Sequence, residues 1–474
     1  MHFYIRKGSK NMEHIYTREI PQSKKLRKYI HKIYLIIAIF CGLLISTIMP
    51  LFNEPDGQYH FAVSSAIVGL NTDISKYGED EIGSGMSGQK SFYRNGTFLE
   101  QYFFTKATIY PSKDSPRNLD LGNKFNYNYI GHLIPAAGVW IGYRLYPSLG
   151  MMIVIARLFS MFVYSVIMYF IIKYLKFGKL LFATVSLSPV IMNTFSSLSY
   201  DSLGMVTAAA TVALMINMIA FKKVRFWDWI LMAILLGLSL IGSKPNLWLI
   251  NVLFPLVVIL VLLMPRSEQR EDIYLRRNRV KANLLIRYKW FFSLGLLIIF
   301  IVAGSYMTRD RGGLFEVIIR LIFTQSFRFY DIYSPGDFGN LLVSPYPYYN
   351  YMPTILIAIW GILIVLVSIS EKAFHKSVLL SFSASLVIML GIFSAYYGFL
   401  GYGSLSGFAL RMTIQGVQWR YFTPLLLLLP LIFSNERIKF RVPSRNSVVI
   451  FMIVTAIVSN FLLVFNTLWG MIMV

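Results

Sequence analysis

Long apolar runs alternate with shorter polar segments along most of the chain. Many of these runs extend over about 18 residues with few or no charged side chains, which is the length that an α-helix needs to cross a bilayer. They are too long and too numerous for the core helices of a water-soluble domain. We therefore expect an all-α polytopic membrane protein with about 11 transmembrane helices. The predicted spans are residues 33–51, 149–172, 180–196, 203–221, 228–243, 247–264, 290–307, 351–369, 378–398, 416–434 and 448–470.

The apolar stretch GHLIPAAGVWIGY at 131–143 does not fit the pattern clearly. It is short for a span, contains Pro135 and is followed by Arg144. Such a segment crosses the membrane, re-enters it or lies in the interface. The hydrophobic pattern alone leaves this choice open, and the choice sets the orientation of every later span.

The distribution of charge favours one orientation. The chain has 45 Lys and Arg against 22 Asp and Glu, a net charge of +23. If the N-terminus is cytoplasmic and 131–143 does not cross, most basic residues lie in inner segments, as the positive-inside rule requires. If 131–143 did cross, the strongly basic segment 265–289 would lie outside. We thus predict a basic cytoplasmic N-terminus at 1–32, followed by a transmembrane domain at 33–474.

The same orientation places two long segments on the extracytoplasmic side. They are the first outer loop, 52–148, which we expect to carry interfacial helices, and a second large outer loop, 308–350. The inner loops are short and basic. We therefore expect the functional chemistry on the outer face.

The excess of positive charge does not indicate a nucleic-acid partner. The basic residues are divided among short loops, without interleaved aromatic residues, and their placement matches contact with anionic lipid head groups. The single cysteine, Cys41, lies in the first apolar run, so neither an intrachain disulfide nor a cysteine metal cluster can form. We expect no cofactor and no metal site, although a loosely held divalent ion on Glu54 and Asp56 stays open.

The segment FNEPDGQYHF at 52–61 places three ionisable side chains directly after the first span: Glu54, Asp56 and His60. Pro55 suits the first turn of a helix capped by Asn53 or Glu54, and apolar residues follow at helical spacing. We expect a short interfacial helix that directs Asp56 and His60 into a protein cavity. The alternative is a helix cap with a solvated polar face.

Three further ionisable residues lie at predicted span edges on the same side of the membrane. Asp201 lies in SSLSYDSL, Lys244 in GSKPN and Arg420 in GVQWRYFTP. Each has a simpler explanation, since Asp201 is a possible helix N-cap and the two cations are possible anchors for phospholipid head groups. Together, they provide the composition that a lipid-linked phosphate and a proton acceptor require.

Four blocks of the sequence, in their order and spacing, resemble the DUF2142 family of bacterial membrane proteins, which is similar to GT-C glycosyltransferases. The blocks are NEPDGQYHF, SYDSL, SKPNLWL and GVQWRYFTPLL. The first meets the family pattern at Pro55, Asp56 and His60, and the last meets it at Gln418, Arg420, Tyr421 and Pro424. The chain departs from the pattern at Gly57, where the family usually has Glu, and at Trp419, where it has Gly.

The resemblance implies a GT-C-like fold and transfer of a sugar from a polyprenyl-phosphate carrier to an envelope glycan, outside a bacterial cell membrane. In that reading Asp56 is the general base, Glu54 is a second carboxylate beside it, and His60 orients Asp56 or binds sugar. The residues implied in substrate binding are Asp201, Lys244, Arg309, Gln418, Arg420 and Tyr421. The sugar, the acceptor and any protein partner are not predicted.

Two other functions stay open at this point. One is a transporter or flippase of lipid-linked sugars, and the other is a non-catalytic subunit of an envelope polysaccharide assembly complex. A carrier should place charged groups near the middle of the bilayer, whereas the acidic residues here fall in loops or at span edges. We therefore favour the enzyme.

Overall fold

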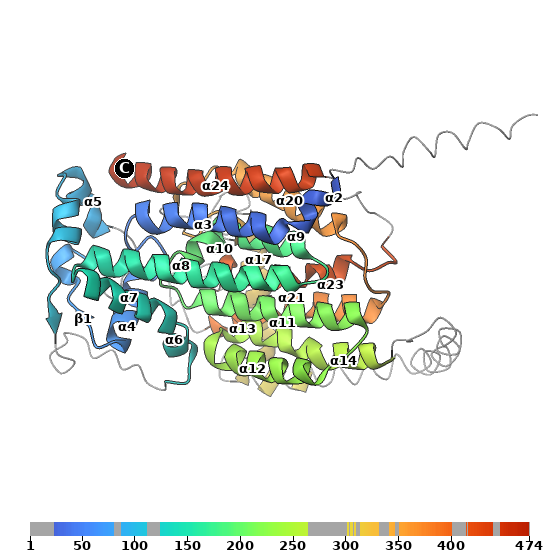
Figure 1. Cartoon of the computed structure of the whole chain (residues 1–474). Helices are drawn as coiled ribbons and strands as arrows, with labels where there is room; N and C mark the ends of the chain where they lie inside the picture. Colours follow the sequence, from blue (N-terminus) through green and yellow to red (C-terminus); the bar gives the residue numbers. More distant parts are fainter. Residues whose placement is uncertain are drawn as a thin grey trace, which may run out of the picture.

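The structure is a computed structural model in which an elongated bundle of helices carries a small group of elements at one end (Figure 1). It describes residues 23–79, 87–110, 124–263, 301–302, 304–306, 308–309, 313–330, 341–346, 350–400, 414, 416–438 and 446–473. Apart from one pair of two-residue strands, the regular elements in this part of the chain are helical. The all-α prediction is therefore confirmed.

The first half of the chain contains these elements: α2 (Ser23–Lys28), α3 (Ile30–Ile48), α4 (Gly57–Ile67), β1 (Asn71–Thr72), η1 (Ser75–Tyr77), α5 (Ser87–Arg94), the π-helical turn η2 (Glu100–Phe104), β2 (Ile109–Tyr110), α6 (Tyr127–Ile130), α7 (Leu133–Leu145), α8 (Leu149–Tyr174), α9 (Lys179–Ser186), α10 (Pro189–Phe195) and α11 (Asp201–Phe221). The second half contains α12 (Phe226–Gly242), α13 (Pro245–Trp248), η3 (Leu249–Val252), α14 (Leu253–Leu263), α17 (Gly313–Tyr330), α20 (Ile355–Ser370), α21 (Val378–Gly398), the 3₁₀-helix η6 (Trp419–Leu428), α23 (Leu429–Phe433) and α24 (Asn446–Met473).

Six helices in the described part of the chain are long and apolar enough to cross a membrane. They are Ile30–Ile48, Leu149–Tyr174, Asp201–Phe221, Pro245–Leu263, Val378–Gly398 and Asn446–Met473, and each matches a predicted span within a few residues. Three shorter apolar helices, Phe226–Gly242, Ile355–Ser370 and Trp419–Phe433, match three more. The chain is therefore a multi-pass membrane protein, and the total of about 11 spans stays a prediction.

The predicted span at 180–196 is not a single helix. Its residues form α9 and α10, which are separated by Leu187 and Ser188. The Ser188 hydroxyl caps the new helix by accepting a hydrogen bond from Ile191 N at 3.4 Å, and Pro189 occupies its first turn. The predicted span at 290–307 lies largely outside the described residues.

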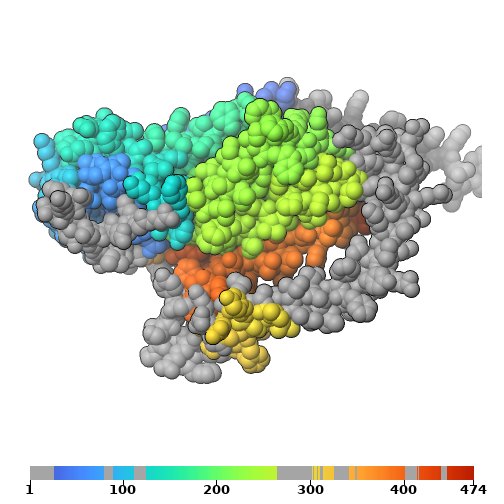
Figure 2. All heavy atoms as spheres, turned by 90° about the horizontal axis from the view of Figure 1, so that it is seen from below, coloured from blue at the N-terminus to red at the C-terminus, as the bar shows by residue number. Residues whose placement is uncertain are grey.

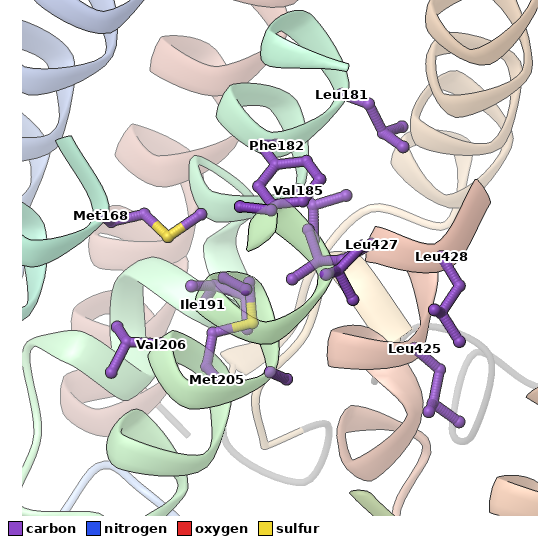
Figure 3. Close-up of a cluster of buried hydrophobic side chains, with 14 of the residues drawn as sticks. Met168, Leu181, Phe182, Val185, Ile191, Met205, Val206, Leu425, Leu427 and Leu428 are labelled. Atoms are coloured by element: carbon purple, nitrogen blue, oxygen red, sulfur yellow. The ribbon is translucent and has the colours of Figure 1, made fainter. Parts of the chain in front are cut away.

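The two halves of this broken helix lie at the centre of the bundle. Figure 3 shows side chains from several segments meeting there, among them Met168, Phe182, Val185, Met205 and Leu427. All five are buried. Because lipid tails are as apolar as these side chains, the central contacts stabilise the bundle mainly through close van der Waals packing.

Helix α12 has a face that is largely exposed in the described part of the structure. Its exposed side chains include Phe226, Trp227, Trp229 and Ile234. Figure 2 shows this side of the molecule, where α12 and its neighbours form a broad green surface. Aromatic rings clustered at one end of an apolar helix are typical of the membrane interface.

The segment predicted as the first outer loop forms the group of elements at one end of the bundle. The strands β1 and β2 pair antiparallel, with Asn71 opposite Tyr110. The buried side chain of Gln89 in α5 fixes the group to the end of α3, because its amide nitrogen donates to Leu51 O at 2.6 Å and its oxygen accepts from Leu51 N at 3.0 Å. The residues around α4 are thereby held against the ends of the long helices.

The ambiguous stretch 131–143 lies mostly in α7. This helix has 13 residues, about 20 Å at 1.5 Å per residue, which is short of the roughly 30 Å hydrocarbon core. It packs along the first part of α8, where a Cβ at Gly138 would lie 2.5 Å from Ala156 Cα and one at Gly142 would lie 2.6 Å from Met151 O. The length supports the topology in which this stretch does not cross.

Candidate functional site

The loop after α3 is fixed by a buried arginine from α8. Arg157 is 0% exposed and donates to Met49 O at 3.1 Å and to Pro50 O at 2.9 Å. It also donates to Asn53 Oδ1 at 2.6 Å and forms an ion pair with Glu54 at 3.2 Å. A guanidinium has five N–H donors in a fixed plane, which allows one side chain to hold several turns of loop at once.

Glu54 is therefore enclosed. Its side chain is 2% exposed, and its second oxygen accepts from Leu198 N at 3.3 Å. The prediction that Asn53 or Glu54 caps the following helix is wrong, because both side chains are bonded to Arg157. The N-cap is Asp56, whose φ of 59° places it in the left-handed region, and α4 begins at Gly57.

The fold around residue 57 leaves no room for a side chain. A Cβ at this position would lie 2.8 Å from Phe52 Cα, closer than real contacts allow. Phe52 is itself left-handed, with φ of 57°, so the loop folds tightly back on the start of α4. Glycine, which has no Cβ, is therefore the residue that this turn accommodates.

His60 and His132 form a buried pair beneath this turn. His60 Nδ1 lies 2.9 Å from His132 Nε2, and His132 Nδ1 is hydrogen-bonded to the Asn128 carbonyl. Since that carbonyl only accepts, His132 carries its proton on Nδ1 and His60 donates to His132. His60 Nε2 then has a free lone pair, and it has no partner among the described residues.

Both imidazoles are neutral at pH 7. Burial lowers the pKa of His60 well below its ordinary value, and His132, Arg420 and Lys244 lower it further. Burial also lowers the pKa of His132 to about 4, although the Asn128 carbonyl and Asp201 oppose this effect. The influence of Arg420, Lys244 and Asp201 shows that the pair adjoins a second group of charges.

Three of the predicted site residues form this second group of charges. Lys244 Nζ lies 3.0 Å from Asp201 Oδ1, and Arg420 Nη1 lies 3.3 Å from Asp201 Oδ2. The side chains are 17%, 6% and 20% exposed for Lys244, Arg420 and Asp201. One carboxylate therefore holds two cations that are distant in sequence, and this centre carries one net positive charge.

Aromatic and amide groups complete the centre. Lys244 Nζ lies 3.6 Å from the centroid of the Tyr421 ring and 4.9 Å from that of Tyr200. Gln418 Oε1 accepts from Arg420 Nε at 2.5 Å. The rings and the amide direct the two cations and stabilise their charge away from bulk water.

Each charged residue lies at an interruption or an end of a helix. Asp201 is the first residue of α11, where the helix dipole favours a negative charge. Lys244 follows the end of α12 in extended backbone, before Pro245 opens α13. Arg420 lies in η6, a 3₁₀-helix of ten residues that contains Pro424. The polar groups thus reach the site from places where apolar helices stop.

The centre lines a small cavity of about 20 Å³. That volume is enough for roughly one water molecule. Its lining residues are Ile191, Thr194, Tyr200, Asp201, Gly204, Met205, Ser243, Lys244, Asn246, Leu247, Arg420, Tyr421 and Pro424. A sugar or phosphate ligand cannot be enclosed here without movement of the surrounding segments.

The remaining predicted residues lie at different distances from this centre. The prediction that the helix directs Asp56 and His60 into this cavity is wrong, because Asp56 is exposed as the N-cap of α4 and neither residue lines the cavity. The charge of Asp56 nevertheless acts on both Arg420 and Tyr59. Arg309 is exposed and is not among the residues that line the cavity. The structure thus brings Asp56, His60, Asp201, Lys244, Gln418, Arg420 and Tyr421 into one region, while Glu54 lies in its separate ion pair.

Sequence reasoning missed Arg157, His132 and Tyr200. An arginine inside a predicted span is costly and almost always paired, so the sequence already indicated that Arg157 has an acidic or polar partner. His132 is the second residue of the ambiguous stretch 131–143, and only the packing of α7 against α4 brings it to His60. Among the described residues, no three His, Cys, Asp or Glu side chains are grouped to hold a metal ion.

Comparison with known proteins identifies one family. No significant match was found to a curated protein, and none was found to a solved structure. The profile of the family described as predicted membrane protein (DUF2142) matches residues 39–429, which include the Arg157 loop, the histidine pair and the Asp201 centre. The chain therefore belongs to the DUF2142 family of membrane proteins.

Proposed function

We propose that this protein is an integral-membrane glycosyltransferase that moves a sugar from a polyprenyl-phosphate carrier to an envelope glycan on the extracytoplasmic face. A GT-C-like arrangement of its helices is part of the proposal. The observation that carries it is the Asp201 centre, in which Lys244 and Arg420 are held together at the ends of apolar helices, while the charge of the exposed Asp56 acts on Arg420. A lipid-linked phosphate requires cations that are accessible from a membrane-embedded scaffold.

Lys244 and Arg420 are suited to hold the phosphate of the carrier. When the bond between the anomeric carbon and the phosphate oxygen breaks, the electron pair stays on that oxygen, and negative charge grows there. Fixed cations stabilise this charge without reorganising. Asp201 keeps both cations in place before the substrate arrives, and the phosphate takes over part of that role.

Asp56 is the better of the two candidate bases. The base removes the proton from an acceptor hydroxyl as its oxygen attacks the anomeric carbon. Asp56 is exposed and reachable by an acceptor, whereas Glu54 is buried against Arg157. We therefore assign Glu54 to the structure of the loop, and Asp201 to positioning, because it already holds two cations.

His60, Gln418 and Tyr421 support this arrangement. Neutral His60 fixes the first turn of α4 by its contact with His132, while its backbone N–H donates to Asp56 O at 2.9 Å. Gln418 directs Arg420, and Tyr421 covers Lys244. Arg309 is not needed for the proposed site.

The test is the glycan composition of a deletion strain that carries plasmid-borne variants. We expect wild-type protein to restore the parental glycan and Asp56→Asn to lose at least about 100-fold of transfer, since a general base contributes roughly that much or more. Glu100→Gln is the matched control, because Glu100 is an exposed carboxylate of the same outer segment. Parental glycan in the Asp56→Asn strain would remove Asp56 from the role of base.

The same strains separate the enzyme from a flippase. A blocked transferase leaves lipid-linked sugar in the outer leaflet, where an impermeant lectin or glycosidase reaches it. A blocked flippase leaves it in the inner leaflet. A non-catalytic subunit would tolerate Asp56→Asn, provided that the protein is present at its normal level.

A further inference from the structure

A second and much larger cavity lies at the opposite end of the bundle. Its volume is about 260 Å³, against about 20 Å³ beside Asp201. It lies between α2, the first residue of α3, the start of α9 and the end of α20 (Figure 1). Its lining residues are Arg27, Ile30, Lys176, Phe177, Gly178, Lys179, Leu180, Glu371 and Lys372.

The lining is strongly basic. Arg27, Lys176, Lys179 and Lys372 face a single carboxylate, Glu371, which is already engaged by Leu180 N at 2.9 Å. Burial and the neighbouring charge of Lys176 lower the pKa of Lys179, although Glu371 opposes this. The cations are thus crowded, and a bound anion would relieve their repulsion.

Arg27 is held at the wall of the cavity. Its Nη2 donates to Ser370 O at 3.1 Å, which fixes the side chain there. Its Nε is buried, so that N–H does not reach into the cavity. Arg27 therefore serves the site through the fixed position of its charge, which is permanent at any physiological pH.

We propose that this cavity binds the phosphate of an anionic membrane lipid. Phosphate oxygens match the donors of Arg27 and the lysines. The apolar side chains of Ile30 and Phe177 in the same lining suit the glycerol and upper acyl carbons of a lipid. Basic pockets between helices at the cytoplasmic surface are typical sites for acidic lipid head groups.

The position in the fold favours a lipid over free phosphate. Ile30 is the first residue of a candidate span, and Lys176 follows the end of another, so the cavity lies at the level where a bilayer surface would be. The head group would join α2, α9 and α20, three elements that lie far apart in the sequence. The site is separate from the proposed transferase centre and does not depend on it.

The experiment measures lipid binding to the full-length protein by native mass spectrometry and by thermal unfolding in nanodiscs. Lipids are phosphatidylglycerol as the anionic probe and phosphatidylcholine as the zwitterionic one, and inorganic phosphate is added in a separate arm. The cavity variant is Lys176→Gln with Lys372→Gln, since both side chains are exposed and their loss leaves the wall intact. The matched control is Lys28→Gln with Lys223→Gln, two exposed lysines that do not line the cavity.

We expect phosphatidylglycerol to bind roughly 30-fold more weakly to the cavity variant, since each lost hydrogen bond from a lysine to the phosphate costs about fivefold in affinity. The control should lose much less. A second variant, Arg27→Gln, should weaken binding further if it folds.

Equal losses in the cavity and control variants would leave only general surface attraction and overturn the site. Competition by inorganic phosphate at concentrations as low as those of the lipid would overturn the assignment to a lipid. Equal binding of phosphatidylcholine would overturn the role of the anionic head group.

Discussion

Two carboxylates that are neighbours in the sequence occupy opposite environments. Glu54 is enclosed with Arg157, whereas Asp56, two residues later, is exposed and left-handed. The sequence motif could be found without a structure, since it packs several ionisable groups at the end of a span. Which of the two carboxylates is buried could not be predicted, because the partner of Glu54, Arg157, lies 103 residues away in the sequence.

The first prediction at this scale concerns Glu54. Glu54→Gln should lower the free energy of unfolding by about 3–5 kcal/mol, because it leaves the buried Arg157 charge without its partner. Asp56→Asn should change it by less than about 0.5 kcal/mol, as an exposed substitution does. Thermal unfolding in detergent with an intrinsic fluorescence readout compares the two. Similar stability of both variants would show that the ion pair does not hold the loop.

The second prediction concerns the pH dependence of stability that the buried histidines cause. The pKa of His132 is lowered to about 4, while an unfolded histidine titrates near 6.5. Between these values the unfolded chain binds more protons, so stability falls as the pH falls from 6.5 to 4, by roughly 3 kcal/mol for this group. His60, whose pKa is also lowered, adds in the same direction.

The measurement compares wild type with His132→Asn, whose amide nitrogen takes the place of Nδ1 as donor to the Asn128 carbonyl but does not titrate. The thermal midpoint of the variant should depend less on pH between 6.5 and 4.5. Parallel pH profiles for the two proteins would contradict a neutral, buried His132.

At the scale of elements, the hydrophobic runs predicted the positions of the long helices to within a few residues. They did not predict where the helices are interrupted. The break at Ser188, the extended residues before Pro245 and the 3₁₀ backbone of η6 depend on packing at the centre of the bundle. Because Lys244 and Arg420 lie at such interruptions, the cluster of site residues was predictable from charge, while its geometry was not.

The third prediction tests how closely α7 and α8 approach. Gly138→Ala should destabilise the protein by about 1–3 kcal/mol, since the new methyl group would lie 2.5 Å from Ala156 Cα and the backbones must separate. Gly237→Ala is the control, because nothing lies within 4 Å of its Cβ position, and it should be neutral or stabilising. The free energy of unfolding of both variants, measured in the same detergent, decides between a tight and a loose contact.

For the whole molecule, the two ends of the bundle differ in composition. One end carries the α4 to α7 elements and the Asp201 centre, and the other carries the basic cavity and exposed lysines such as Lys173 and Lys223. The positive-inside rule assigns the second end to the cytoplasm. The orientation stays a prediction from the distribution of charge, and labelling tests it.

The fourth prediction uses the single native cysteine, Cys41, which is buried and gives little background. Asn95→Cys should react with a membrane-impermeant maleimide on intact cells, and Lys223→Cys should react only after the membrane is permeabilised. Both positions are exposed. The reverse pattern would place the proposed transferase centre in the cytoplasm and remove its extracytoplasmic substrates.

Pro424 has a consequence for the reach of Arg420. A proline ring inside an α-helix clashes with the carbonyl four residues earlier, which here is the carbonyl of Arg420, so η6 cannot wind into a regular α-helix through this point. A 3₁₀-helix rises about 2.0 Å per residue and an α-helix about 1.5 Å, so the ten residues of η6 extend roughly 5 Å farther from α23 than an α-helix of the same length would. The proline thus acts as a spacer that keeps the guanidinium at Asp201.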